Sequence, residues 1–192
     1  TGFFGRVLHR RPSVTLKLAT TIDSRIAMQD GESQWITGPP ARRQVHAMRA
    51  RHDAVLTGMG TVMADDPMLT CRISGLEGRS PTRVILDSRL SLPLTSALAR
   101  SARDIKTMII TTSAAPYHPE NVLKDLGIEV VRVQADQAGL VVPDAALKAL
   151  ADRGITSVLM ETGARLATSF LAADLVDRLV WFRGPMLIGG DG

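Results

Sequence analysis

Short apolar segments alternate with amphipathic ones along the chain, and this pattern predicts strands that alternate with helices. Residues 14–20 alternate strictly, because Val14, Leu16 and Leu18 point one way and the residues between them point the other. Further apolar runs predict strands at residues 53–56, 83–86, 108–111, 130–133, 157–160 and 179–182. Helical spacing predicts helices at about residues 39–51, 119–126, 143–152 and 164–173. Such alternation is typical of an α/β fold with a largely parallel, covered sheet.

The ends of these helices carry the residue types that helix termini favour. Thr37 is expected to be the N-cap of the first helix, and Pro39 and Pro40 suit its first turn. Gly127 and Gly154 stand just after two later helices, where a left-handed residue commonly ends the helix.

Residues 53–72 predict a ligand loop at the end of a strand. A short apolar run breaks into the sequence TGMGT at residues 57–61, where two glycines allow a tight turn or close approach to a ligand. Paired acids and a proline follow at residues 65–67, and then Leu69, Thr70 and Arg72. Polar groups beyond the carboxyl end of a strand are where α/β proteins bind ligands. An ordinary surface loop is the alternative interpretation.

Charged side chains in unusual places are the candidates for chemistry. Lys17 stands in the middle of a strand, so it either extends to solvent from an edge or faces a polar cavity. Arg49 lies at the border of the apolar stripe of its helix and is expected to reach inward, whereas Arg42 and His46 on that side suit a solvated face. Glu161 ends a strand, and residues 162–164 open a helix whose N-terminal N–H groups attract phosphate. A plain strand-to-helix turn is the alternative there.

Composition restricts the class of protein. A chain of 192 residues with 45% hydrophobic and 22% charged residues is long enough for one domain with a full core. No apolar run approaches the length of a membrane span, no secretory signal is recognisable, and the single cysteine, Cys71, cannot form an intrachain disulfide. We therefore expect a cytoplasmic protein. The net charge of +4 is spread over the chain and only 4% of residues are aromatic, which disfavours a nucleic-acid surface.

Metal sites and standard nucleotide motifs are not expected. The four histidines show no ligand spacing, so no metal is predicted. The chain has no Walker A motif and no GxGxxG fingerprint, so a Rossmann-type cofactor site is not indicated. With one cysteine and no CxxC motif, the chain cannot carry the zinc site of a nucleobase-type deaminase.

The chain resembles the reductase domain of bifunctional riboflavin-biosynthesis deaminase–reductases over nearly its whole length. The most specific match is GESQWIT at residues 31–37 followed by ADDP-x-LT-x-R at residues 64–72. The pattern continues with VILDS at residues 84–88, ETG at residues 161–163 and GPMLIGG at residues 184–190. The resemblance implies the dihydrofolate-reductase-like fold, an α/β three-layer sandwich with a central, mostly parallel sheet.

The resemblance also implies a domain organisation. Residues 1–13 are expected to form an N-terminal tether and residues 14–192 the reductase domain. The deaminase domain that precedes such a tether in the family is absent from this chain, and the C-terminal end is expected to be truncated or missing. One departure concerns the expected cofactor loop, where Thr162 replaces the first of two glycines. A β-branched residue resists positive φ, so Thr162 must have ordinary dihedral angles if the loop keeps its function.

By the same resemblance, the protein is an NADPH-dependent reductase that converts the ribose of 5-amino-6-(5-phosphoribosylamino)uracil to a ribityl chain. The implied substrate residues are Ser33, Thr37, Arg49, Asp65, Leu69, Arg72 and Glu161. The implied cofactor residues are Ala19, Trp35, Thr61, Asp65, Ser88, Gly163, Ala164, Arg165, Leu166, Ala167, Thr168 and Ser169. Lys17 and Glu161 are the candidate catalytic residues, Arg49 and Arg72 the candidate phosphate ligands, and a homodimer is expected. The alternatives are a reductase of the same fold with another pterin- or pyrimidine-like substrate, and a non-catalytic nucleotide-binding module.

Overall fold

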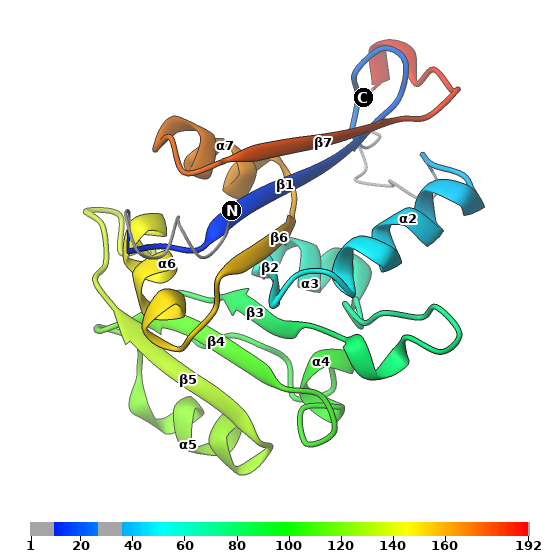
Figure 1. Ribbon diagram of the computed structural model, residues 1–192. Coiled ribbons are helices and arrows are strands. Elements are labelled where there is room, and N and C mark those ends of the chain that lie inside the picture. The colour runs from blue at the N-terminus through cyan, green and yellow to red at the C-terminus, as the bar shows by residue number, and fades with distance from the viewer. Residues whose placement is uncertain (1–9, 27–35, 192) are drawn as a thin grey trace.

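One seven-stranded sheet forms the centre of the computed structural model, which describes residues 10–26 and 36–191 (Figure 1). Its strand order is β5-β4-β3-β2-β6-β1-β7, and each neighbouring pair is parallel. The strands are β1 (Ser13–Thr20), β2 (Ala54–Gly58), β3 (Thr82–Leu86), β4 (Thr107–Thr112), β5 (Ile128–Val133), β6 (Ser157–Glu161) and β7 (Arg178–Arg183). All seven predicted strands are confirmed, with ends that differ by one or two residues.

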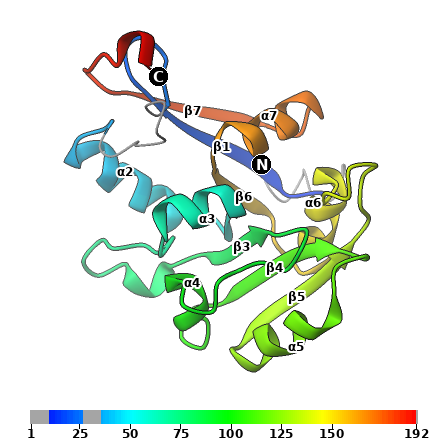
Figure 2. The ribbon, with the colours of Figure 1, turned by 180° about the vertical axis from the view of Figure 1, so that it is seen from behind.

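Helices cover both faces of this sheet, which confirms the three-layer α/β sandwich. They are α2 (Pro39–Arg49), α3 (Met59–Asp65), α4 (Ala97–Arg100), α5 (Tyr117–Asp125), α6 (Pro143–Asp152) and α7 (Ala164–Ala172). Short 3₁₀ turns occupy Glu77–Arg79 and Gly189–Asp191. Both views show α2, α3 and α4 on the side of the sheet away from α6 and α7 (Figure 1 and Figure 2).

Alternation along the strands produces two separate apolar cores. On one face, Leu16 and Leu56 belong to the cluster that includes Leu147 of α6 and Phe170 of α7. On the other face lie the alternate strand residues, such as Val55 next to Leu56. They pack with side chains of α3, α4 and α5. The period of two seen in the sequence therefore corresponds directly to the two sides of the sheet.

Two local predictions are corrected by the structure. Thr37 is not the N-cap of α2, because Gly38 holds that position with no side-chain cap, and the Thr37 carbonyl accepts an N–H of Arg42 instead. Part of the expected glycine loop after β2 is helical, because α3 begins at Met59 directly after Gly58. Gly127 and Gly154 do end their helices with φ of +87° and +85°, as predicted.

The chain after β7 runs directly against the turn after β1 and the segment before α2. Gly184 donates its N–H to the Thr20 carbonyl at 2.7 Å, and a Cβ at position 184 would lie 1.8 Å from the carbonyl oxygen of Ile36. Only glycine fits there. The Asp23 carboxylate accepts the N–H of Gly189 at 2.7 Å. These contacts fix one rim of the site described next.

Candidate functional site

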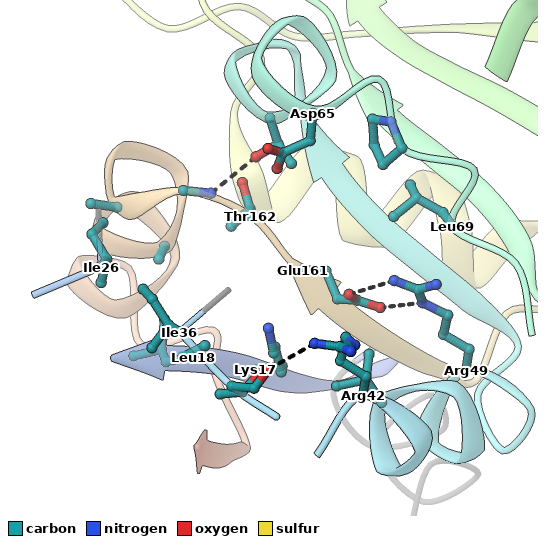
Figure 3. A pocket seen from close by; sticks show the side chains of 18 of the residues that line it. Lys17, Leu18, Ile26, Ile36, Arg42, Arg49, Asp65, Leu69, Glu161 and Thr162 are labelled. Atoms are coloured by element: carbon teal, nitrogen blue, oxygen red, sulfur yellow. Dashed lines mark hydrogen bonds and ion pairs between the residues drawn. The ribbon is translucent and has the colours of Figure 1, made fainter. Parts of the chain in front are cut away.

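A cavity of about 540 Å³ opens at the carboxyl ends of β1 and β6, between α2, α3 and α7 (Figure 3). Parallel strands bring their carboxyl ends to one edge of a sheet, and the order of the strands places β1 and β6 side by side there. The predicted site residues that line this cavity are Lys17, Ala19, Thr37, Arg49, Thr61, Asp65, Leu69, Arg72, Glu161, Gly163, Ala164, Ala167 and Thr168.

The structure does not bring every predicted residue to this cavity. Ser33 and Trp35 lie outside the described residues. Among the predicted residues that are described, Ser88, Arg165, Leu166 and Ser169 do not line it. The Ser88 hydroxyl instead accepts the N–H of Val141 at 3.0 Å, and the Ser169 hydroxyl donates to the Leu166 carbonyl within α7.

Lys17 faces the cavity from the interior of the sheet. Strand β1 lies between β6 and β7, so the alternative of a lysine that extends from a sheet edge is wrong. Lys17 is paired in register with Glu161 on β6, and both side chains lie at the cavity (Figure 3). Burial lowers the pKa of the Lys17 ammonium, Glu161 opposes this change, and the positive charge of Arg49 adds to it.

Arg49 forms a two-pronged ion pair with Glu161. Its Nε and Nη2 lie 2.6 and 2.8 Å from the two carboxylate oxygens, and each side chain is only 11% exposed. Its Nη1 donates to the Thr70 carbonyl at 3.0 Å. Three of the five N–H groups of Arg49 are thus used within the protein, so at most two remain for a phosphate. Each Glu161 oxygen keeps a second lone pair for a ligand.

The segment from Asp66 to Arg72 forms one wall of the cavity in a constrained backbone conformation. Asp66 and Leu69 have φ of +38° and +53°, which non-glycine residues rarely adopt. The Asp66 carboxylate accepts the N–H of Ala97 at the start of α4, and the Thr70 carbonyl receives the N–H of Arg49. The segment that carries Arg72 is therefore anchored by two hydrogen bonds, one at the Asp66 carboxylate and one at the Thr70 carbonyl.

The N-terminus of α7 opens onto the cavity. Gly163 is the N-cap, and Gly163, Ala164, Ala167 and Thr168 all border the cavity. The Gly163 N–H donates to the Thr61 hydroxyl in the cavity wall at 3.2 Å, and a Cβ at position 163 would point toward the same hydroxyl. Thr162 is not among the residues with positive φ, as its β-branched side chain requires. Small residues and exposed N–H groups at a helix start suit a bound phosphate.

Two cavity residues on α2 were not predicted from the sequence. Arg42 and His46 were expected on a solvated helix side, yet both line the cavity together with Arg49. Their spacing of four and three residues does place all three on one helix face, so periodicity contained this signal. Ile36 and Thr162 also line the cavity. The apolar side chain of Ile36 gave no signal of a ligand, whereas Thr162 lies in the segment 162–164 that was expected to attract phosphate.

The described part of the chain contains neither a cluster suited to a metal ion nor a helix suited to a membrane. No group of three or more His, Cys, Asp or Glu side chains is arranged there to hold a metal ion. None of the helices in that part of the chain has both the length and the apolarity of a membrane span.

Comparisons with known proteins agree with this architecture. Acinetobacter baumannii RibD (form 2) superposes with a TM-score of 0.83 at 36% identity, over 100% of this chain and 51% of that chain. The Thermotoga maritima diaminohydroxyphosphoribosylaminopyrimidine deaminase/5-amino-6-(5-phosphoribosylamino)uracil reductase gives a TM-score of 0.79 at 35% identity, over 98% and 49%. Saccharomyces cerevisiae Rib7, a riboflavin biosynthesis reductase, shares the fold at 24% identity, with a TM-score of 0.75 over 99% and 84%.

Sequence relatives lead to the same family. The riboflavin biosynthesis protein RibD of Bacillus amyloliquefaciens is 38% identical over 179 residues, which are 93% of this chain and 47% of the relative. That of Mycobacterium tuberculosis H37Rv is 39% identical over 181 residues, 93% of this chain and 44% of the relative. The chain thus spans about half the length of these relatives. The family model described as the RibD C-terminal domain matches residues 12–192, and the chain therefore belongs to the RibD C-terminal domain family.

Proposed function

We propose that this chain is the NADPH-dependent reductase of riboflavin biosynthesis, which reduces the ribose of 5-amino-6-(5-phosphoribosylamino)uracil at C1′. The observation that carries the proposal is that four features border one cavity. Lys17 and Glu161, which are paired on adjacent strands, lie at the cavity together with the N-terminus of α7 and the segment that carries Arg72. Membership of the RibD C-terminal domain family supports it, and the reductase activity named for the Thermotoga maritima protein supports the substrate.

The α7 side of the cavity is assigned to the cofactor. Gly163, Ala164 and Thr168 at the start of α7 would hold the pyrophosphate, with Thr61 and Ala19 beside it. When bound there, the nicotinamide cofactor supplies the hydride. NADPH rather than NADH, and the roles given to the residues outside the cavity, remain predictions from the family resemblance.

The opposite side of the cavity is assigned to the substrate. Arg72 extends from the segment 66–72 and is the main candidate for the 5′-phosphate, because its guanidinium is a planar set of donors that matches phosphate oxygens. Arg49 orients Glu161 through its ion pair and adds positive charge. Glu161 accepts hydrogen bonds from the N–H groups of the pyrimidine through its remaining lone pairs. Thr37, Asp65 and Leu69 complete the walls.

Lys17 is assigned to proton transfer at the ribose. Reduction at C1′ requires the bond between C1′ and the ring oxygen to open, and the leaving ring oxygen needs a proton. The ammonium of Lys17 lies in the cavity, with a pKa that burial moves toward neutrality, and can deliver this proton. Ile36, which packs against Gly184, lines one side of the partly enclosed site, and this wall limits the access of water to the opened sugar.

The decisive experiment is to mix the purified protein with NADPH and the phosphoribosylaminouracil and to follow the loss of NADPH absorbance and the formation of the ribityl product. Turnover with NADPH and little with NADH would support the proposal. Binding of NADPH without turnover of this substrate would favour a reductase with another pyrimidine or pterin substrate. Failure to bind NADPH at all would leave the non-catalytic nucleotide-binding module.

The proposal also covers the assembly and location of the protein. A homodimer and a cytoplasmic location are expectations from the family resemblance and composition, as is the boundary between a tether and the reductase domain at residue 13. Light scattering of the purified chain measures its mass in solution, and a mass of one chain would contradict the dimer.

A further inference from the structure

One histidine nitrogen contacts the backbone of the Arg72 segment at two points. The Nδ1 atom of His46, in the last turn of α2, lies 3.0 Å from the Thr70 carbonyl and 3.3 Å from the Arg72 backbone nitrogen. These two groups flank Cys71, so a single ring atom is placed between them. A neutral ring protonated at Nε2 accepts the Arg72 N–H, whereas a ring protonated at Nδ1 donates to Thr70 instead.

The surroundings favour the form that accepts the Arg72 N–H. The Thr70 carbonyl already receives an N–H from Arg49 at 3.0 Å and does not depend on His46 for a partner. Burial lowers the pKa of the His46 ring, and the positive charges of Arg49 and Arg72 act in the same direction. The hydrogen bond with Thr70 and the negative charge of Glu161 partly oppose them. A ring that stays neutral has an acceptor nitrogen available for Arg72.

The hydrogen bond from the Arg72 N–H to His46 is one of two neighbouring bonds that orient the backbone at Arg72. Cys71 is buried, and its N–H donates to the Ser80 hydroxyl at 3.1 Å. Two successive N–H groups are therefore held in different directions, that of Cys71 by Ser80 and that of Arg72 by His46. The exposed side chain of Arg72 then extends into the cavity from a backbone whose orientation is set by α2.

We propose that His46 is a positioning residue for phosphate recognition, which orients Arg72 through its backbone N–H so that the guanidinium meets the phosphate of the ligand. This inference rests on the proposed function, because it deepens the role given there to Arg72. His46 itself does not need to touch the reacting atoms.

The position of His46 predicts how the affinity for phosphate depends on pH. Protonation of His46 places a hydrogen on Nδ1 and removes the acceptor of the Arg72 N–H, and the added positive charge offsets only part of this loss. The wild-type protein should therefore lose affinity for phosphate as the pH falls through the lowered pKa of His46. The charged groups that border the same cavity come from five parts of the chain: Arg42 and Arg49 of α2, Asp65 of α3, Arg72 of the segment 66–72, Glu161 of β6 and Lys17 of β1.

The test compares His46→Leu, which removes the ring nitrogen, with His46→Asn, whose amide places a hydrogen-bonding atom near the position of Nδ1. Gln44→Leu is the matched control, because Gln44 is exposed on the same helix and outside the cavity. Three quantities are measured for each variant: KM for the phosphoribosylaminouracil, KM for NADPH and Kd for ribose 5-phosphate by calorimetry. The loss of one such hydrogen bond corresponds to roughly a five- to tenfold effect.

We expect His46→Leu to raise the substrate KM and the ribose 5-phosphate Kd by about five- to tenfold, with kcat and the NADPH KM within twofold of wild type. His46→Asn should restore most of the affinity, and Gln44→Leu should change nothing. An unchanged substrate KM and Kd in His46→Leu, or equal losses for substrate and NADPH without recovery in His46→Asn, would overturn the inference.

A comparison of ribose 5-phosphate binding with turnover distinguishes a failure of this inference from a failure of the proposed function. If the wild-type protein binds ribose 5-phosphate but does not reduce the pyrimidine, the proposed function fails while the effect of His46 on phosphate affinity is still measured. The pH dependence of the ribose 5-phosphate Kd supplies the last readout, because the acid loss attributed to His46 should disappear in His46→Asn. It should persist in His118→Asn, since His118 is exposed on α5 and remote from the cavity. Identical pH profiles in all three proteins would also contradict the inference.

Discussion

Lys17 and Glu161 occupy paired positions on adjacent parallel strands, but the ion pair of Glu161 is formed with Arg49. Glu161 therefore has its charge balanced from α2, at 2.6 Å, rather than from the lysine beside it. A lysine whose only purpose were to neutralise a carboxylate would be redundant here. This arrangement favours a role for Lys17 in chemistry over a role in filling space.

Replacement of Lys17 by methionine tests that role. Because a positioned acid contributes about 10²–10⁴-fold, we expect Lys17→Met to lower kcat by about a hundredfold or more, with the NADPH Kd preserved. Methionine keeps the length and apolar volume of the lysine stem, so the fold should survive. Stopped-flow kinetics and calorimetry measure the two quantities, and turnover within a few-fold of wild type would exclude Lys17 from the mechanism.

The titration of Lys17 should also be visible in the pH dependence of kcat. Burial lowers the pKa of Lys17 from its ordinary value of 10.5, and the protonated form is the acid. Activity that depends on this proton is therefore present below the lowered pKa and is lost as the pH rises through it. We expect an alkaline decline of kcat at a pH below 10.5 in the wild type and no such decline in the residual activity of Lys17→Met. An alkaline decline shared by both proteins would assign it to another group.

Arg72 should matter for the substrate and not for the cofactor. A hydrogen bond to a charged group is worth about 1.5–3 kcal/mol, so Arg72→Ala should raise the substrate KM at least tenfold. NADPH affinity should hardly change. Arg79→Ala removes the same charge from a nearby exposed turn outside the cavity and is the control. Steady-state kinetics with the opposite pattern, a raised NADPH KM and an unchanged substrate KM, would reverse the assignment.

Gly163 should matter for the cofactor. Its φ of −73° is accessible to any residue, so Gly163→Val can fold, but its side chain would project toward Thr61 across the start of α7. We expect the NADPH Kd to rise at least tenfold, because a branched side chain would occupy the space of the pyrophosphate. Ala172→Val changes an exposed residue of the same helix outside the cavity, and this variant should bind NADPH normally. Unchanged affinity in a folded Gly163→Val protein would place the pyrophosphate elsewhere.

The Arg49–Glu161 pair should show strong coupling in stability. Both side chains are nearly buried, so Arg49→Met leaves a carboxylate without its partner, and we expect a loss of about 3–5 kcal/mol in the free energy of unfolding. Adding Glu161→Gln to that variant removes the unpaired charge and should recover part of the loss. Urea denaturation of the two single variants and the double variant measures the coupling, and simple additivity would show that the pair contributes little.

Local pattern and chain resemblance determined most of the fold and much of the cavity. The alternation of Val14, Leu16 and Leu18 predicted β1, because the period of a strand is a property of neighbouring residues alone. The same reasoning predicted the other strands and the helices α2, α5, α6 and α7. The sequence positions of Lys17, Arg72, Glu161 and the start of α7 suggested a site, and all of them line one cavity. Resemblance to a known family added the expected substrate and cofactor.

Only the tertiary structure decided the partners of those residues. Helix α3 forms although Gly58 and Gly60 predicted a loop, because Val62 is buried in the core beneath it and packing outweighs local propensity. Arg49 meets Glu161 across 112 residues of chain, and His46 meets Thr70 and Arg72 across the gap between α2 and the loop. Such contacts depend on strand order and on which faces meet, and these are set by burial across the whole chain rather than by any local period.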